Sequence, residues 1–487
     1  MITASFRRDL MNKDVVIIGA GIVGCAIARE LSKYDLKIAV VEKDNDVANG
    51  ISKANSGIIH AGYNEKKGTL KAELNIKGNK MYDALSKELD FKFNRNGALV
   101  LAFNDEDMYT LENLKSKGQG LGVEGLEILS KEEVSKVEPN IADDIVGALH
   151  AKTSGIVSPY EVTIALAENA CTNGVEFIFD AEVINIDKID SGYELALKDG
   201  QSINSTMVIN AAGINSDEIN NMIGENKYTL KPVKGEYILL DKIAGKLINK
   251  TIFQVPSKIS KGILVTPTAD GNLLVGPTAK EIDSKEALES TKDSLNYILE
   301  KSTKSVKNLP IGRVLTTFAG LRPHLDYGDF IIEATGENEN FISLIGIESP
   351  GLTAAPAIAV YVKDMVSRRL PLKEKADFNP YRKGIIKFTD LSLEEKNALI
   401  AKNPAYGRMV CKCELITEGE IVDAINRPLG ARTVDAVKRR TRATMGGCQG
   451  VGCLLPISKI ISRELGIDIT EVVKDSKVSP VVGFKEV

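Results

Sequence analysis

The sequence predicts an α/β protein with a Rossmann-like domain, a second domain built on an antiparallel β-sheet, and a small helical C-terminal module. The first domain follows from KDVVIIGAGIVGCAIAREL, an apolar strand, a glycine turn and a helix. The second follows from KPVKGEYILLD and ILVTPTADGNLLVGPTA, which alternate in strand fashion and include a Gly-Asn hairpin signal. The third follows from four cysteines gathered between residues 411 and 453. A chain of 487 residues is also too long for one hydrophobic core.

The composition is that of an ordinary globular protein, 43% hydrophobic and 26% charged. A net charge of −4 argues against a general nucleic-acid binder. No apolar run approaches the roughly 20 residues of a membrane helix, and MITASFRRDLMNKD lacks the apolar core of a secretory signal. We therefore expect a cytoplasmic protein. Because thiols stay reduced there, its paired cysteines indicate a metal or redox centre before a structural disulfide.

The first glycine turn has the spacing G-x-G-x-x-G at Gly19, Gly21 and Gly24. Gly19 makes the turn, Gly21 lets backbone approach a pyrophosphate, and Gly24 lets the helix pack closely on the strand. The second strand, LKIAVVEKD, ends at Glu42, which can accept the ribose hydroxyls of an adenosine. This pattern predicts a dinucleotide site but does not separate NAD from FAD.

The stretch after the second strand, SKANSGIIHAGYNEKKGTLKAEL, lacks the strand-helix alternation of a simple nicotinamide domain. With STMVINAAGINSDEI and FISLIGIESPGLTAAPAIA, it makes the chain similar to the D-amino-acid-oxidase-like flavoprotein superfamily over roughly residues 13–370. The resemblance implies FAD. It also implies further cofactor contacts at Asn55, Ser56, Gly57, Val183, Ala211, Ala212, Gly213, Gly346, Gly351, Leu352 and Thr353.

Three phrases, HAGYNEKKGTLKA, VKGEY and FAGLRPHLDYGDFII, resemble the branch that holds the anaerobic glycerol-3-phosphate dehydrogenase large subunit and the L-2-hydroxyglutarate dehydrogenases. This implies oxidation of a secondary alcohol on a small anion, by hydride transfer to flavin N5. We expect sn-glycerol 3-phosphate to be oxidised to dihydroxyacetone phosphate. L-2-hydroxyglutarate or another 2-hydroxy acid, an amino or imino acid, and a non-catalytic electron-transfer subunit are the alternatives.

The expected catalytic residues are His60, Arg322, His324 and Lys234, and the expected substrate contacts are Tyr63, Lys66, Lys67, Tyr237 and Arg322. Arg322 can grip a phosphate or carboxylate with two hydrogen bonds. His60 can act as a base, orient the flavin or substrate, or carry the flavin covalently, and His324 is the rival base. If the VKGEY strand alternates, Lys234 and Tyr237 point to opposite faces.

One departure bears on the substrate. Related glycerol-3-phosphate dehydrogenases carry Arg-Tyr just after His-Gly-Gly, and that arginine helps hold phosphate. Here Tyr63 follows Gly62 directly. The lysines at positions 66 and 67 can substitute only as point charges, which keeps a carboxylate substrate open.

The cysteine pattern is C-x-C followed by C-x4-C, at Cys411, Cys413, Cys448 and Cys453. It resembles the bacterioferritin-associated-ferredoxin-like (BFD-like) [2Fe–2S] domain, with zinc or redox thiols as alternatives. A Thr-x-x-Glu capping box at Thr417 predicts a helix to about Asn426.

Thr433 opens a second predicted helix with a basic stripe, made up of Lys438, Arg439, Arg440 and Arg442. The stripe is expected to be a solvated face or a dock for an acidic partner. A cluster that passes electrons singly implies an exit to a partner, such as a second flavoprotein or an electron-acceptor subunit, which could also hold the protein at a membrane surface.

The expected domain ranges follow from these motifs. The FAD-binding domain takes 11–85, 146–215 and 311–370, and the substrate domain takes 86–145 and 216–310. A charged linker, 371–405, leads to the cluster module at 406–475.

Overall fold

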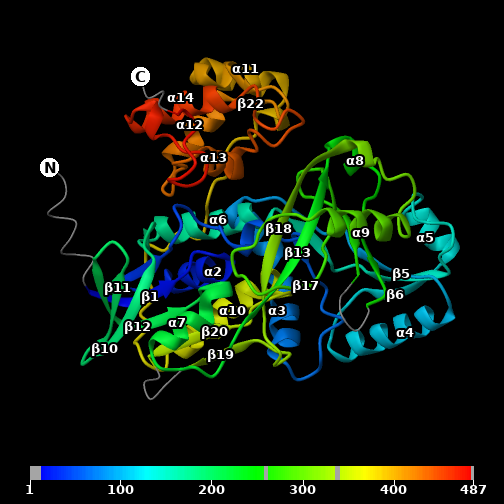
Figure 1. Ribbon diagram of the computed structural model, residues 1–487, viewed down its shortest axis with the longest axis horizontal. Helices are drawn as coiled ribbons and strands as arrows, with labels where there is room; N and C mark the ends of the chain where they lie inside the picture. The colour runs from blue at the N-terminus through cyan, green and yellow to red at the C-terminus, as the bar shows by residue number, and fades with distance from the viewer. Residues whose placement is uncertain (1–11, 257–261, 335–339, 484–487) are drawn as a thin grey trace.

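The computed structural model describes residues 12–256, 262–334 and 340–483 (Figure 1). Residue 11, the expected start of the FAD-binding domain, lies outside this part of the chain. Two large sheets with their helices form the body, and the C-terminal module lies on top of it in the view of Figure 1.

The first sheet is centred on β1 (Asn12–Ile18). The parallel strands are β2 (Ile38–Val41), β9 (Glu176–Ile178), β12 (Ser202–Asn210) and β20 (Phe341–Ile345). The antiparallel ones are β10 (Val183–Ile189), β11 (Gly192–Leu197) and β19 (Ile331–Ala334). The parallel strands end on one edge of the sheet, where ligands bind in open α/β folds.

Helices cover one face of this sheet: α2 (Ile22–Leu31), α3 (Leu70–Leu89), α6 (Pro159–Thr172) and α10 (Gly351–Val366). Val15 and Ile17 pack under them, whereas Val16 and Ile18 pack on the opposite side with β10, β11 and α7 (Ser216–Met222). β1 is therefore buried on both faces, which explains its unbroken apolar run.

The second sheet has nine strands. In chain order they are β5 (Ala98–Ala102), β6 (Leu126–Ser130), β7 (Gly147–Ala151), β13 (Lys231–Leu240), β14 (Thr251–Gln254), β15 (Leu264–Pro267), β16 (Leu273–Gly276), β17 (Lys280–Glu281) and β18 (Val314–His324). The expected antiparallel arrangement of β13 with the β15–β16 hairpin is confirmed, while β5 and β14 run parallel. β13 and β18 pair along their whole length.

The remaining elements are smaller. The helices are α4 (Asp105–Gly120), α5 (Lys131–Val137), α8 (Lys242–Gly245) and α9 (Lys292–Thr303). A three-stranded sheet comprises β3 (Ile58–Ile59), β4 (Phe93–Asn94) and β8 (Gly155–Val157). The 3₁₀ turns are η1 (Ile51–Lys53), η2 (Gly213–Asn215), η3 (Ile311–Arg313), η4 (Phe388–Asp390), η5 (Pro404–Gly407) and η6 (Ile469–Glu471).

Three elements lie elsewhere than the expected domain ranges put them. β7 and β18 were assigned to the FAD-binding ranges, yet they belong to the nine-stranded sheet because their backbones pair with β5, β6 and β13. α7 was assigned to the substrate domain, yet Ile219 packs in the core of the first sheet beside Phe341. The other boundaries stay a prediction.

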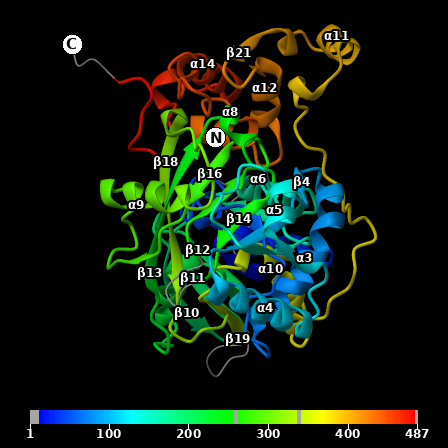
Figure 2. The ribbon, with the colours of Figure 1, turned by 90° about the vertical axis from the view of Figure 1, so that its right-hand side faces the viewer.

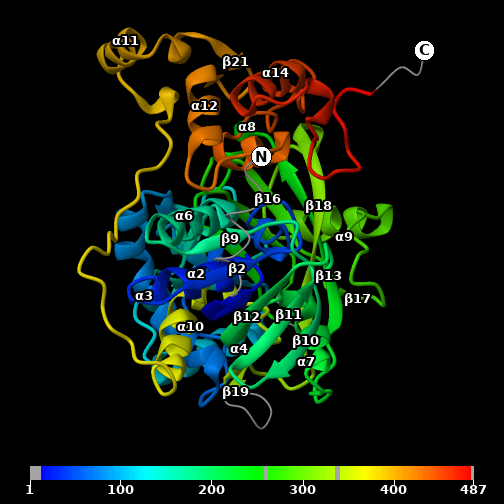
Figure 3. The same ribbon diagram turned by 90° about the vertical axis from the view of Figure 1, so that its left-hand side faces the viewer.

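The segment after α10 runs along the outside of the body before it reaches the module (Figures 2 and 3). Asn379 and Arg382 tie it to α6 through Asn169 and Glu168. Its last part is α11 (Leu393–Lys402), a helix inside the range expected to be a linker.

The module contains β21 (Met409–Cys411), β22 (Ile416–Thr417), α12 (Glu418–Asn426), α13 (Val434–Thr441) and α14 (Leu454–Leu465). The predicted capping box at Thr417 and the helix start at Thr433 are both confirmed. Of the helices that the structure describes, none is long and apolar enough to cross a membrane.

Candidate active site and cluster site

The glycine turn after β1 packs directly on the loop after β12. Gly19 has φ +104°, and a Cβ on it would lie 2.6 Å from the Ala211 carbonyl oxygen. A Cβ on Gly24 would lie 2.0 Å from the Gly19 carbonyl oxygen. Only glycine fits either position. Gly21, the residue before α2, leaves the helix N-terminus open, with the Ser52 hydroxyl accepting from the Ile22 N–H at 2.9 Å.

Glu42 lies at the end of β2, at the same edge of the sheet. Its carboxylate accepts hydrogen bonds from the Ala20 N–H at 2.7 Å and the Asp44 N–H at 3.0 Å. Burial nevertheless raises the pKa of Glu42 to about 7. A buried carboxylate beside an open helix N-terminus suits the ribose and pyrophosphate of a dinucleotide. Val183 lies at the start of β10, in the same core cluster as Val41.

A cleft of about 560 Å³ lies between the two sheets. It extends from the N-terminus of α2 at Ile22 to the N-terminus of α10 at Gly351. It brings together many of the residues expected at the site: Asn55, Ser56, His60, Tyr237, Arg322, His324, Gly351 and Leu352. A long cleft with a helix N-terminus at each end fits an extended dinucleotide that carries phosphates.

Other expected cofactor contacts lie next to the residues that line the cleft, without being part of the lining. The Thr353 hydroxyl is fully buried and accepts from the His60 N–H at 2.9 Å. Gly57 and Gly346 have φ values of +66° and +68°, in the left-handed region that favours glycine. Ala212 and Gly213 form the turn after β12 at the start of η2.

Arg322 and His324 lie on one face of β18, and both line the cleft. A Cβ on Gly235, on the neighbouring strand, would lie 3.6 Å from Arg322 Nη2, so this strand lies in van der Waals reach of the guanidinium. Arg322 pairs with no carboxylate among the described residues. His60 faces the same cleft, with Nε2 3.4 Å from the Ser349 hydroxyl.

Four of the expected catalytic and substrate-binding residues lie outside the cleft lining. Strand alternation turns Lys234, an expected catalytic residue, away from the cleft, and its Nζ lies 2.8 Å from Glu289 Oε1. A catalytic role for Lys234 stays a prediction that this placement does not favour. Tyr237 takes the cleft side, with its hydroxyl 3.5 Å from the Ser56 hydroxyl. Lys66 and Lys67 are exposed and outside the cleft lining, and Tyr63 lines a small neighbouring cavity.

Lys71 and Glu348 line the cleft and were not expected from the sequence. Lys71 Nζ is 2.8 Å from Glu348 Oε1. The signals were present, because Lys71 follows Lys66 and Lys67 in one phrase and Glu348 directly precedes the last glycine loop. The sequence alone did not reveal how α3 is rotated about its axis, which determines which lysine faces the cleft.

The four cysteines of the module form two pairs. The Cys413 thiol lies beside that of Cys448, and the Cys411 thiol lies beside that of Cys453. Backbone N–H groups of the glycine-rich loop, notably those of Gly452 and Gly450, donate to Cys448 and lower its pKa. Among the described residues, there is no group of three or more metal-binding side chains placed to hold a single ion. Four cysteine sulfurs in two neighbouring pairs are ligands of the kind that an iron–sulfur cluster takes.

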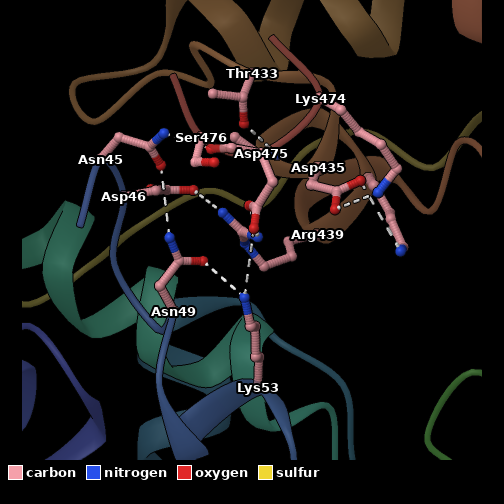
Figure 4. Close-up of polar contacts among 12 residues, drawn as sticks. Asn45, Asp46, Asn49, Lys53, Thr433, Asp435, Arg439, Lys474, Asp475 and Ser476 are labelled. Atoms are coloured by element: carbon pink, nitrogen blue, oxygen red, sulfur yellow. Dashed lines mark hydrogen bonds and ion pairs between the residues drawn. The ribbon is translucent and has the colours of Figure 1, made fainter. Parts of the chain in front are cut away.

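The basic stripe of α13 is an internal contact, so both expectations for it were wrong. Arg439 is buried against Asp46, with an N–O distance of 2.8 Å (Figure 4). Arg440 is also buried against Asp46, with an N–O distance of 2.7 Å. Burial alone would raise the Asp46 pKa, but the two guanidinium groups hold it at about 2. Arg442 binds Asp270 of the β15–β16 turn at 2.7 Å. The stripe therefore fastens the module to both sheets of the body.

Comparison with known proteins defines the class. The FAD dependent oxidoreductase (DAO) family matches residues 14–365, and the BFD-like [2Fe-2S] binding domain matches residues 409–463. The chain thus belongs to the FAD dependent oxidoreductase family and carries a BFD-like [2Fe–2S] binding domain. The expected fold class and the two expected cofactors, FAD and a [2Fe–2S] cluster, are confirmed.

Individual relatives narrow the class. The chain is 53% identical to a glycerol 3-phosphate dehydrogenase of Caloramator mitchellensis, over 95% of this chain and 96% of that protein. It is 37% identical to a glycerol 3-phosphate oxidase of Mycoplasma pneumoniae, over 71% of this chain and 92% of the relative. The dithionite-reduced, FAD-bound structure of L-alpha-glycerophosphate oxidase from that organism superposes with a TM-score of 0.73 at 35% identity, covering 76% of this chain and 98% of its own.

Proposed function

We propose that this protein is a glycerol 3-phosphate dehydrogenase that oxidises sn-glycerol 3-phosphate to dihydroxyacetone phosphate. The observation that carries the proposal is the 53% identity to a glycerol 3-phosphate dehydrogenase over 95% of the chain, the cysteine module included. The oxidase relative matches only 71% of the chain. The added module gives this protein an exit for electrons that an oxidase passes to oxygen.

Arg322 is the proposed phosphate ligand, since its guanidinium lines the cleft and can form two parallel hydrogen bonds to phosphate oxygens. The cleft holds the carbinol carbon so that its C–H bond faces the cofactor. Bound FAD supplies the acceptor for the hydride. His60 or His324 takes the hydroxyl proton as the C–H bond breaks and the C=O bond forms.

Cys411, Cys413, Cys448 and Cys453 are the proposed ligands of the cluster, which supplies a one-electron carrier. With the cluster bound, these four cysteines would hold a carrier that could pass on, one at a time, the two electrons that leave the substrate as a hydride. The proposed acceptor is a separate redox protein, such as a second flavoprotein subunit. Because the cluster needs reduced thiolates, we place the reaction in the cytoplasm.

The experiment is an anaerobic titration of the purified holoenzyme, followed through its flavin absorbance. Addition of sn-glycerol 3-phosphate is expected to bleach the flavin band within seconds, while equal L-2-hydroxyglutarate leaves it unchanged. Bleaching by the hydroxy acid alone would move the protein to the second candidate. No bleaching by either substrate, with both cofactors present, would favour the non-catalytic electron-transfer subunit.

The second candidate, an L-2-hydroxyglutarate dehydrogenase, rests on one departure from the branch pattern. No arginine follows Gly62, so one expected phosphate ligand is missing. The chain is also 30% identical to the L-2-hydroxyglutarate dehydrogenase of Escherichia coli K12, but the match covers only 59% of the present chain. The cleft holds a further feature that separates the two substrates.

A further inference from the structure

Glu348 is a carboxylate held inside the substrate cleft by two neighbours. Its Oε1 is 2.8 Å from Lys71 Nζ, and its Oε2 is 3.2 Å from His324 Nδ1. Its side chain is 16% exposed and that of Lys71 is 10% exposed. All three residues line the cleft, so the group belongs to its wall rather than to the outer surface.

The supports of Glu348 are themselves fixed. Asp329 accepts hydrogen bonds from the Leu70 and Lys71 N–H groups, both at 2.9 Å, which anchors the first turn of α3 beside the cleft. Lys71 Nζ also lies 5.5 Å from the centre of the Phe330 ring. Glu348 begins the turn that opens α10, where the Gly351 N–H bonds back to its carbonyl. Rigid supports on both sides give the carboxylate one position.

Glu348 lies at a defined place relative to the proposed phosphate ligand. Arg322 and His324 are two residues apart on β18 and share its cleft face. A strand rises about 3.4 Å per residue, so their Cα atoms are roughly 7 Å apart. Since Glu348 contacts His324, the cleft wall holds two charged places near each other: the Arg322 guanidinium and, beside His324, the Glu348 carboxylate with its partner Lys71.

The charges of the cleft wall favour a substrate with one anionic end. Among the described lining residues, the carboxylates are Glu65, Glu281 and Glu348, and the Lys and Arg side chains are Lys71 and Arg322. Lys71 already pairs with Glu348. A second carboxylate beside Glu348 would have to compete with Glu348 for Lys71, the one Lys or Arg side chain among the described lining residues besides Arg322, which disfavours its binding.

We propose that Glu348 is a specificity-determining residue, which accepts a hydrogen bond from the neutral hydroxyl end of the substrate and excludes a second carboxylate. This rests on the proposed function and deepens it. Glycerol 3-phosphate has one phosphate and a neutral hydroxyl at the other end, whereas 2-hydroxyglutarate has a carboxylate at each end. A site that hydrogen-bonds a hydroxyl rejects an analogue without it strongly.

The test compares binding of two products to the oxidised holoenzyme, which neither product can reduce. Dihydroxyacetone phosphate and 2-oxoglutarate are titrated while the shift of the flavin band is recorded. In Glu348→Gln, we expect dihydroxyacetone phosphate to bind about tenfold more weakly and 2-oxoglutarate at least tenfold more tightly. Each factor of ten corresponds to about 1.4 kcal/mol. Rates of flavin reduction by the two alcohols should move in the same directions.

Glu182→Gln is the matched control, because the described cleft lining does not include Glu182, whose side chain is 45% exposed and pairs with Lys198. It should leave both dissociation constants within about twofold. Equal weakening of both ligands in Glu348→Gln would assign Glu348 a structural role and overturn the proposal. Tighter binding of dihydroxyacetone phosphate would also overturn it, because Lys71, once released, would then be a phosphate ligand.

The two proposals fail in different experiments. If sn-glycerol 3-phosphate does not reduce the wild-type flavin, the proposed function falls. The ratio of the two product dissociation constants still decides whether Glu348 selects against a second carboxylate. Thermal unfolding and the flavin content of Glu348→Gln show whether that variant is intact.

Discussion

In the glycine turn, two stretches of backbone approach so closely that a single residue type decides whether they fit. A Cβ on Gly24 would lie 2.0 Å from the Gly19 carbonyl oxygen, and that oxygen belongs to backbone that cannot rotate away. α2 would have to move off β1, taking the N–H groups of its first turn with it. Replacing one Cα hydrogen of Gly24 by a methyl group would therefore disturb both the packing of α2 on β1 and the binding of the cofactor.

Gly24→Ala is expected to destabilise the protein by about 1–3 kcal/mol or more and to weaken FAD binding. Urea unfolding and the flavin content after dialysis measure the two effects. Gly120→Ala is the control, since a Cβ there meets nothing within 4 Å and α4 is helical at that point. A Gly24→Ala protein as stable as wild type would mean that α2 shifts without cost.

Glu42 gives the apoprotein a pH dependence of its own. Burial raises its pKa from 4.5 to about 7, so the folded apoprotein holds this proton more tightly than the unfolded chain. Stability from this group is present at low pH and is lost as the pH rises through the window from 4.5 to about 7.

The Glu42→Gln apoprotein should therefore gain stability relative to wild type as the pH rises from 5 to 8, by up to about 3 kcal/mol. Urea unfolding at each pH gives the difference. The comparison is between the two proteins, because other groups titrate in the same range. A difference that does not change with pH would show that Glu42 ionises freely in the fold.

At the scale of elements, α13 shows what local sequence signals can and cannot predict. Its start at Thr433 and the capping box of α12 could be predicted because both depend on contacts within four residues. The role of its basic stripe could not, because Asp46 is separated from Arg440 by nearly the whole chain. The same limit hid Glu348, whose partners Lys71 and His324 come from α3 and β18.

Asp46→Asn tests the contact between α13 and the body. Removing Asp46 leaves the buried Arg440 guanidinium without its counter-charge and Arg439 with only the longer contact to Asp475 at 3.6 Å, so we expect a loss of about 3–5 kcal/mol. The Asp46 pKa of about 2 also means that its contribution is lost as the pH falls from roughly 4 towards 2. Thermal unfolding and limited proteolysis of the module report the change.

Asp283→Asn is the matched control, since Asp283 is an exposed aspartate. It should change the unfolding temperature by less than about 1 °C, as surface substitutions usually do. If Asp46→Asn behaves in the same way, the module is held by its other contacts, such as that of Arg442 with Asp270.

The whole molecule joins two sheets, a cleft between them and a cluster module, and the sequence predicted these parts better than their borders. The glycine motifs and the cysteine spacing identify the cofactor domains because each motif depends on a short stretch of chain. The sequence did not predict that β7 and β18 belong to the second sheet and α7 to the first. These assignments depend on strand pairing and packing between distant parts of the chain. Lys234 shows the limit of sequence prediction for a single residue. Strand alternation predicted that Lys234 and Tyr237 point to opposite faces, but not which of these faces lines the cleft.

The arrangement also predicts that substrate oxidation and electron exit can be separated. The cleft and the cysteines lie in different parts of the molecule, and none of the cleft-lining residues comes from the module. Cys448→Ser removes one proposed cluster ligand from a partly exposed loop without touching the buried Asp46 contact. We expect this variant to keep its FAD and to lose the cluster signal in electron paramagnetic resonance after reduction.

Anaerobic reduction of the Cys448→Ser flavin by sn-glycerol 3-phosphate should stay within about twofold of wild type, because the cleft is unchanged. Turnover with a one-electron protein acceptor should fall at least a hundredfold, because the reduced flavin has lost its exit. Cys171→Ser is the control, since that cysteine packs against the core of the first sheet. Turnover that survives loss of the cluster would mean that the acceptor takes electrons at the cleft and that the module has another role.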